Sequence, residues 1–233
     1  MSASDLPPGT FPFTKLPPGR MPQGLVKASG GAGPTVVTWS PTQHDPNVTL
    51  SPNKLVATAP LLATQGYPGR TDVGAVGSKN YYFELIVTQM DPGQFTQVGV
   101  GNSSMLVTAG NTLGFDSNLT IGFFHSGAVE QNSTQIATIG SYSAGSVLGF
   151  AINPTLGLLW ERVGTGGWLN DILANQNPAT NTGGLNISAL GGGSIFPAYV
   201  VVSDPTTPAI VTAQFALASF TNAAPAGYHA LGN

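Results

Sequence analysis

The chain has 233 residues, of which 41% are hydrophobic and only 7% charged, and its formal net charge is −3. Seven basic residues are too few for the Lys/Arg patch that phosphate recognition needs, which excludes nucleic acid as the main partner. The absence of cysteine excludes disulfides, thiol catalysis and thiolate metal sites. Because the chain holds 31 glycines and 19 prolines and shows no convincing helical periodicity, we expect an all-β protein with many turns.

Two sequence features bear on where the protein is made. No apolar stretch approaches the length of a membrane-spanning helix, so we expect no membrane insertion. The N-terminus also lacks a charged start followed by an apolar run, the pattern of a secretory signal. We therefore expect the protein to be made in the cytoplasm of the producing cell.

Residues 1–34 differ in composition from the rest of the chain. The motif LPPG at residues 6–9 recurs at residues 16–19. Proline holds the backbone extended and removes amide donors, which excludes a helix or a central strand here. Three basic residues against one acidic residue give this segment a charge of +2, whereas four basic and nine acidic residues give the remainder −5.

This composition is typical of a disordered tail, and the alternative is an extended arm that docks onto another protein. We expect a docking arm over residues 1–34, followed by one folded domain over residues 35–233. The side chains expected to contact the docking partner are Phe11, Phe13, Leu16, Arg20 and Met21.

From residue 36 onward, turn residues recur about every ten positions between short apolar runs, which is typical of a β-sandwich. Residues 66–78 and 175–193 are rich in glycine or polar residues and predict long loops. The predicted strands cover residues 36–39, 47–51, 54–58, two short runs within 113–124, and 135–139, 146–152, 156–161, 195–202 and 209–216.

The stretch at residues 79–101, KNYYFELIVTQMDPGQFTQVGVG, predicts a hairpin of two strands joined by a turn. Its first half has the aromatic and β-branched content that strands favour, and Asp-Pro-Gly at residues 91–93 supplies the break. Glu84 is a lone carboxylate in the first strand. Such a group is expected at an edge or surface position, or paired with a partner that satisfies it.

Six segments occur in an order and spacing that resemble a SPRY (B30.2-like) domain, from about Trp39 to the C-terminus. The resemblance implies an antiparallel, concanavalin-like β-sandwich, here preceded by the Pro-rich arm. The chain departs from the family pattern at Gly145-Ser146, in place of Gly-Asp, and at Asn153, in place of Asp. The six segments are Tyr82-Phe83-Glu84, residues 98–101 (VGVG), 145–153 (GSVLGFAIN), 157–160 (GLLW) and 196–198 (FPA), and Phe220 with residues 224–228 (APAGY).

A narrower resemblance is to SPRY domains encoded by tailed bacteriophages. It is carried by Trp-Ser-Pro at residues 39–41, the Gly167-Trp168 turn, the loop at residues 177–188 and the Ala-Pro-Ala-Gly-Tyr ending. It implies a virion protein present in many copies or as a homo-oligomer, with capsid or tail proteins as partners. The expected location is therefore the virion.

An enzyme would need a constellation of reactive groups, and the sequence offers none. Glu84 and Glu161 are the only glutamates placed on predicted strands, without the spacing of a catalytic pair. The three histidines are isolated from one another, and no Gly-x-Ser-x-Gly elbow is present. Asp116-x-Asn118 could contribute to a calcium site, but turn formation explains these residues better. We expect no catalytic residue, no metal and no cofactor.

Loop aromatics beside an arginine could bind a sugar or a protein. The candidate ligand-binding residues are Tyr67, Arg70, Tyr142 and Trp168. For Trp168 the alternative is that it packs over the sheet as part of the core.

The resulting hypothesis is a non-enzymatic virion structural protein, a capsid decoration protein held by its arm with the SPRY domain facing outward. The first alternative is a tail-associated module that recognises a host-surface glycan. The second alternative is a glycoside hydrolase, in which Glu84 and Glu161 would be the acid and base.

Overall fold

The computed structural model describes residues 35–233 except 62–64, 91–95 and 117. The five expected docking residues of the arm therefore lie outside the described residues. The described part is built of two β-sheets and four short 3₁₀ turns, and no α-helix occurs in it. In these ranges no helix is long and apolar enough to cross a membrane. The 3₁₀ turns are η1 (Trp168–Asn170), η2 (Pro178–Thr180), η3 (Ser188–Leu190) and η4 (Leu217–Ser219).

The first sheet has seven antiparallel strands. In order across the sheet they are β1 (Trp39–His44), β4 (Tyr67–Thr71), β13 (Phe196–Val201), β6 (Gln97–Gly101), β7 (Thr120–Phe124), β8 (Ala128–Gln131) and β9 (Thr134–Thr138).

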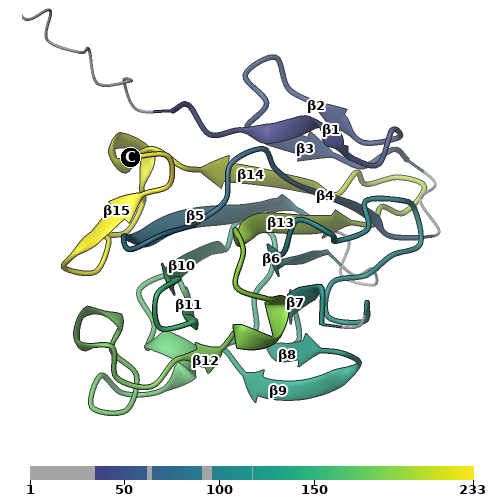
Figure 1. The fold of residues 1–233 in the computed structure, drawn as a ribbon. Helices are drawn as coiled ribbons and strands as arrows, with labels where there is room; N and C mark the ends of the chain where they lie inside the picture. Colours follow the sequence, from purple (N-terminus) through teal and green to yellow (C-terminus); the bar gives the residue numbers. More distant parts are fainter. Residues whose placement is uncertain (1–34, 62–64, 91–95, 117) are drawn as a thin grey trace, which may run out of the picture. The chain divides into compact units, whose positions relative to one another are not determined.

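The second sheet has eight strands, of which seven form one antiparallel path. The eighth, β15 (Tyr228–Ala230), pairs in parallel with the first residues of β5, beside which it lies in Figure 1. The antiparallel path is β12 (Leu185–Asn186), β11 (Leu158–Val163), β10 (Val147–Asn153), β5 (Asn80–Gln89), β14 (Ile210–Gln214), β3 (Val56–Thr58) and β2 (Thr49–Leu50).

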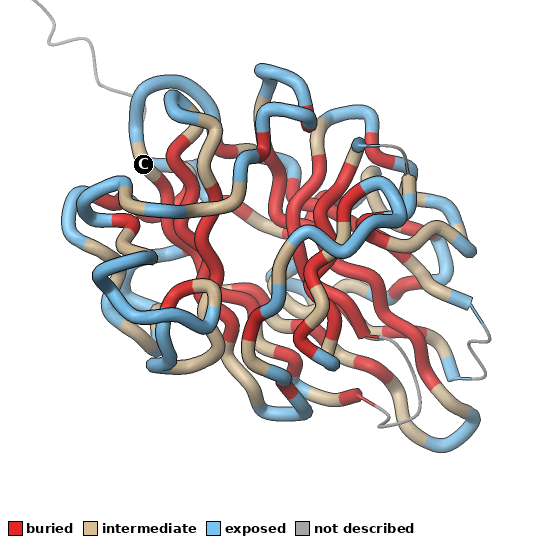
Figure 2. The backbone as a smooth tube through the Cα atoms, turned by 90° about the horizontal axis from the view of Figure 1, so that it is seen from below, coloured by how far each residue is buried: buried red, intermediate tan, exposed pale blue. Residues whose placement is uncertain are grey.

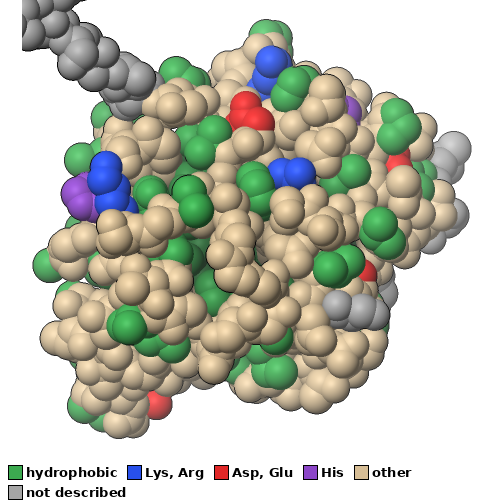
Figure 3. Space-filling model, in the orientation of Figure 1, with side chains coloured by type: hydrophobic (Ala, Val, Ile, Leu, Met, Phe, Trp, Pro, Cys, Tyr) green, Lys and Arg blue, Asp and Glu red, His purple; other side chains and the backbone are tan. Residues whose placement is uncertain are grey.

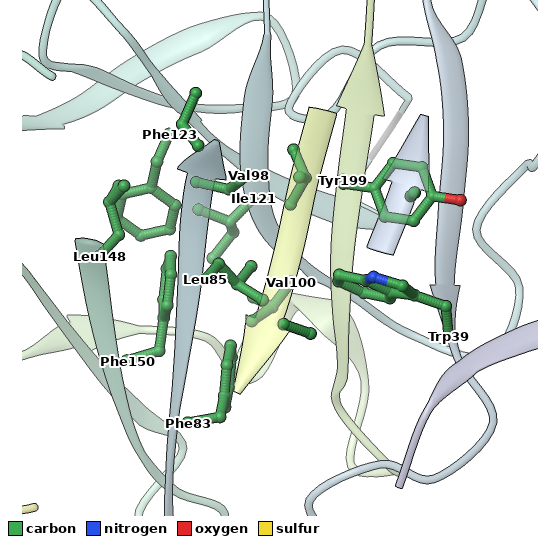
Figure 4. Packing of buried hydrophobic residues seen from close by; sticks show 14 of the residues in the cluster. Trp39, Phe83, Leu85, Val98, Val100, Ile121, Phe123, Leu148, Phe150 and Tyr199 are labelled. Atoms are coloured by element: carbon green, nitrogen blue, oxygen red, sulfur yellow. The ribbon is translucent and has the colours of Figure 1, made fainter. Parts of the chain in front are cut away.

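Aromatic side chains from both sheets fill the space between them (Figure 4). Phe83 of β5 stacks on Phe150 of β10 with ring centroids 5.0 Å apart, and Phe123 of β7 meets Phe150 edge-on at 5.2 Å. Trp39 and Tyr199 make a second edge-on pair at 4.7 Å. Each such pair contributes about 0.5–1.5 kcal/mol beyond the burial of its area. Buried residues follow the strands through the interior, and exposed residues lie mainly in the connecting loops (Figure 2).

The predicted two-strand unit at residues 79–101 is wrong in its pairing. Both strands exist as β5 and β6, but they belong to different sheets, so the chain crosses the sandwich between them. β5 pairs instead with β10 and β14, which makes it a central strand. A short Asp-Pro-Gly break is compatible with a hairpin and with a crossing between layers, so the local sequence did not separate the two.

Four other local predictions also need correction. The loop predicted at residues 175–193 contains the short strand β12 and the 3₁₀ turns η2 and η3. The first predicted strand, at residues 36–39, begins only at Trp39, and residues 66–78 are not all loop because β4 occupies their first part. The stretch 113–124 holds one strand, β7, rather than two. The remaining predicted strands each overlap an observed strand.

Candidate functional site

The four candidate ligand-binding residues were expected in loops, and two of them lie in strand β4. Tyr67 is half-buried there, and Arg70 is buried. The Arg70 guanidinium lies 4.1 Å from the centroid of the Phe196 ring and donates to the Thr71 carbonyl oxygen (3.1 Å) and to Gln43 Oε1 (3.2 Å). Arg70 thus stabilises the junction of three strands of the seven-stranded sheet.

Tyr142 and Trp168 are buried as well. The Tyr142 hydroxyl lies 2.6 Å from the carbonyl oxygen of Phe123 and 3.0 Å from that of Thr96. Burial, with a smaller contribution from the charge of Glu161, raises the pKa of Tyr142 well above its usual range. A buried phenol held in this way ties a loop to the core, and its ring is not available to a ligand.

Trp168 packs against the outer face of the eight-stranded sheet. It meets Tyr82 edge-on, and the Arg162 guanidinium lies 4.5 Å from its ring centroid. Tyr82, Trp160 and Tyr228 belong to the same buried cluster. This arrangement matches the alternative interpretation, in which Trp168 is part of a core.

The four residues do not converge on one site. Tyr67 and Arg70 belong to the seven-stranded sheet, Tyr142 to the core between the sheets, and Trp168 to the outer face of the other sheet.

The strand register separates the two glutamates that a glycosidase would need. Gly149 of β10 is paired with both Glu84 and Arg162, whereas Phe150 is paired with both Phe83 and Glu161. Residues paired across a sheet share a face. Glu84 therefore lies on the outer face and Glu161 on the inner face, so their carboxyl groups cannot flank one glycosidic bond.

A metal centre finds no support in the described ranges, where no three His, Asp or Glu residues gather. Asp116 accepts a hydrogen bond from the Thr120 hydroxyl, and that hydroxyl also accepts from the Gly114 amide. Burial raises the pKa of Asp116. These contacts close the turn before β7, which is the structural role expected for such a residue.

A groove at one end of the sandwich is the best candidate for a binding site, and we call it the glycine groove. It encloses about 440 Å³. None of the residues that line it is ionisable. The lining comes from residues 76–77, 154–157, 187–188, 191–193 and Ile195.

Two loops of the glycine groove adjoin each other and present aliphatic side chains to solvent. The Thr155 hydroxyl donates to the Gly77 carbonyl oxygen (3.3 Å), which joins the loop after β4 to the turn between β10 and β11. Val76 and Leu156, one from each loop, are 53% and 52% exposed. Exposed aliphatic groups at a concave, uncharged surface are a mark of a protein-binding site.

Another part of the lining is a run of three glycines, Gly191–Gly193. A Cβ placed on any of them would meet no atom within 4 Å. Gly191 has φ +80°, which favours glycine, whereas the other two carry no such constraint. A ligand backbone can therefore approach this part of the lining closely.

Asn153 holds the turn that carries Leu156. Its Oδ1 accepts from the Leu156 amide (3.0 Å), and its Nδ2 donates to Asn181 Oδ1 (2.8 Å). An aspartate, which the SPRY pattern has at this position, could accept the first bond but could not donate the second. The departure at Asn153 thus has a local structural reason.

Charged side chains are also scarce outside the groove. On the face shown in Figure 3 they are few and scattered, and hydrophobic side chains are interspersed with uncharged polar surface. This surface suits contacts between proteins better than capture of a strongly charged ligand.

No family model and no curated protein matches the sequence. Among solved structures, the chain is similar to the SPRY domain of human HERC1, at 11% identity over 76% of this chain and 96% of that chain, with a TM-score of 0.55. The sandwich has the SPRY fold.

Two further solved structures align with the same fold. A human SPRY domain aligns at 10% identity over 72% of this chain and 94% of that chain, with a TM-score of 0.52. The TRIM65 PSpry domain aligns at 10% identity over 76% of this chain and 88% of that chain, with a TM-score of 0.51. The SPRY resemblance of the sequence is therefore confirmed for the fold, and at these identities the likeness concerns the fold alone.

Sequence reasoning missed the glycine groove as a site. Its residues come from separate segments between positions 76 and 195 of the chain, and only the run GGG at residues 191–193 marks it locally.

Proposed function

We propose that this protein is a non-enzymatic interaction protein whose SPRY sandwich binds an extended, uncharged segment of a partner protein in the glycine groove. The observation that carries this proposal is the groove itself. It combines two exposed aliphatic side chains, an open glycine lining and no ionisable group. Extended peptides bind such surfaces through backbone contacts and alternate side chains.

A randomised peptide library selected against the purified full-length protein tests the groove. Enriched sequences should lack charged residues, and binding should be lost in Gly192→Trp, which fills the groove at a position open to a side chain. Thr134→Trp, at an exposed position on the distant strand β9, is the matched control and should bind normally. Equal binding by both variants would place the interaction outside the groove.

We propose further that the partners are capsid proteins of a tailed phage and that the protein decorates the virion, held by residues 1–34. The support is the resemblance of the sequence to phage SPRY domains, the scarcity of charge and the opposite net charges of the arm and the sandwich. The burial of Tyr142 and Trp168 leaves only Tyr67, which is half-buried, among the three aromatic residues that the glycan-binding alternative invokes.

Counting copies of the protein in purified particles of the source virus tests this role. Hundreds of copies are expected for decoration, and deletion of residues 1–34 should abolish incorporation while the sandwich stays folded. A handful of copies at the tail would favour host attachment. Absence from particles would refute the virion role.

A further inference from the structure

The glycine groove lies where two paired segments, one after β4 and one before β13, separate from each other. Ala75 and Ile195 form an antiparallel bridge: the Ala75 amide donates to the Ile195 carbonyl oxygen (2.7 Å), and the Ile195 amide donates to the Ala75 carbonyl oxygen (3.0 Å). Residues 76–77 follow this bridge and residues 191–193 precede it, and both segments line the groove. Within the described ranges no bridge joins these two segments to each other. They therefore form two separate borders of the groove.

The first border has its carbonyl oxygens occupied and its amides free. The Tyr81 hydroxyl donates to the Val76 carbonyl oxygen (2.9 Å), and the Thr155 hydroxyl donates to that of Gly77 (3.3 Å). The amides of Val76 and Gly77 donate to no group in the part of the chain that the structure describes. Since both residues are exposed, this border offers hydrogen-bond donors to a ligand.

The second border has nearly the opposite pattern. The Gly191 amide donates to the Ser188 carbonyl oxygen (3.0 Å), and the Gly193 amide donates to the Gly191 carbonyl oxygen (2.8 Å). The carbonyl oxygens of Gly192 and Gly193 accept from no described residue, and the Gly192 amide is free as well. Acceptors thus outnumber donors at this border, and no side chain shields them.

An extended polypeptide backbone fits between a border of donors and a border of acceptors. A trans peptide unit carries its C=O and its N–H on opposite sides, so in a strand they reach the two opposite edges. One peptide unit between the borders can therefore accept from Val76 or Gly77 and donate to Gly192 or Gly193. Main-chain bonds of this kind provide the affinity when a peptide adds to an exposed strand.

We infer that the partner segment enters the glycine groove as a short strand held by its backbone, with one peptide unit bonded to both borders. The inference rests on the proposed function, in which a partner segment occupies this groove. It adds that binding requires a peptide N–H at one position of the segment, which excludes proline there. Val76 and Leu156, which expose aliphatic surface at the same groove, then contact aliphatic side chains of the segment.

An ester scan of the tightest-binding peptide from the library selection is the test. Each ester replaces one peptide N–H by an oxygen atom and keeps every side chain, and calorimetry measures its affinity for the full-length protein. One ester should weaken binding about tenfold, the effect of a lost hydrogen bond that leaves its acceptor unpaired, whereas the esters on either side of it should change affinity less than about twofold. Neighbouring N–H groups of a strand point to the other edge, where the carbonyl oxygens of Val76 and Gly77 are already occupied.

Hydrogen exchange of the protein's own amides provides a second readout. The rate at which each amide exchanges with solvent is measured by NMR on isotopically labelled full-length protein, with and without the same peptide. The peptide should slow exchange at the Val76 or the Gly77 amide, because that amide then donates to a peptide carbonyl oxygen. The amide of Asn132, an exposed residue in the turn between β8 and β9, is the control and should exchange at an unchanged rate.

The results distinguish a failure of this inference from a failure of the proposed function. A peptide whose binding is lost in Gly192→Trp, but whose esters all bind as well as the parent, would overturn the backbone inference and leave the proposed function standing. Equal losses at consecutive ester positions would also overturn the inference, because neighbouring N–H groups cannot reach the same border. So would unchanged exchange at both Val76 and Gly77. A selection that yields no peptide dependent on the groove would refute both proposals.

Discussion

Two glutamates on the same sheet are fully buried, and their surroundings are opposites. Glu84 accepts four hydrogen bonds: from the Tyr82 hydroxyl (2.7 Å), from the amides of Thr221 (2.6 Å) and Asn222 (2.9 Å), and from Asn222 Nδ2 (3.1 Å). Neither carboxyl oxygen of Glu161 has a hydrogen-bond partner among the described residues.

The difference shows that burial alone does not define what a carboxyl group does. Four hydrogen bonds offset the free-energy cost of removing a carboxylate from water. At Glu84 they also join the C-terminal segment to a central strand. At Glu161 no hydrogen bond from the described residues offsets the cost of burying the carboxylate. Burial therefore raises the pKa of Glu161 well above the ordinary value of 4.5, and the charge of Arg162 opposes this shift only in part. Glu84 thus stabilises the fold through its hydrogen bonds, whereas Glu161 is buried without them.

The largest expected effect is that of Glu84→Leu. The substitution removes the acceptor from a buried phenol and from two partly buried backbone amides, so we expect a loss of about 4 kcal/mol in the free energy of unfolding. Urea denaturation at pH 7 measures it. A loss below about 1 kcal/mol would mean that the four bonds do not stabilise the C-terminal segment.

The same substitution at the other position should act in the opposite direction. Glu161→Leu removes an unpaired buried carboxyl group and keeps an apolar side chain in the core, so we expect a gain of about 2 kcal/mol at pH 7. The measurement is identical to that for Glu84→Leu, which makes the two variants controls for each other. Equal destabilisation by both would show that the environments are equivalent.

The pH dependence sharpens the contrast further. Because the folded-state pKa of Glu161 is raised, the folded protein binds an extra proton above the unfolded-state pKa. The free energy of unfolding therefore falls as pH rises through the window between the two pKa values, by about 1.4 kcal/mol per pH unit.

Glu161→Gln removes this titration and should remove that slope. Unfolding free energies of the wild type and the variant between pH 5 and 8 test it. A difference between the two proteins that stays constant across this range would contradict a raised pKa at Glu161.

The smallest effect is expected for Tyr82→Phe. It removes one of the four donors to Glu84 and leaves the ring in its contact with Phe220, 4.9 Å away, so we expect a loss of about 1 kcal/mol. Comparing the thermal unfolding of Tyr82→Phe with that of Glu84→Leu would show whether the four hydrogen bonds contribute separately to stability. A loss as large as that of Glu84→Leu would indicate that they act as one unit.

The sequence predicted the fold class because strand composition, turn spacing and the SPRY-like segments are local signals. It also allowed two interpretations of Glu84, an edge position or one satisfied by a partner, and the second is confirmed. The donors could not be named beforehand, since Thr221 and Asn222 lie 137 and 138 residues away. The crossing from β5 to β6 and the burial of Trp168 depend on tertiary packing for the same reason.

The bonds between Glu84 and the segment at residues 221–222 also set an order of events during synthesis. The ribosome makes β5 long before it makes the segment that covers Glu84 and the strand β15 that extends the sheet beside β5. Until then the Glu84 carboxylate stays hydrated, and Asn80–Tyr82 of β5 lack the strand that pairs with them along this edge. Exposed edges of this kind recruit other chains. The growing chain is therefore vulnerable to aggregation at this edge until β15 has been made and can pair with β5.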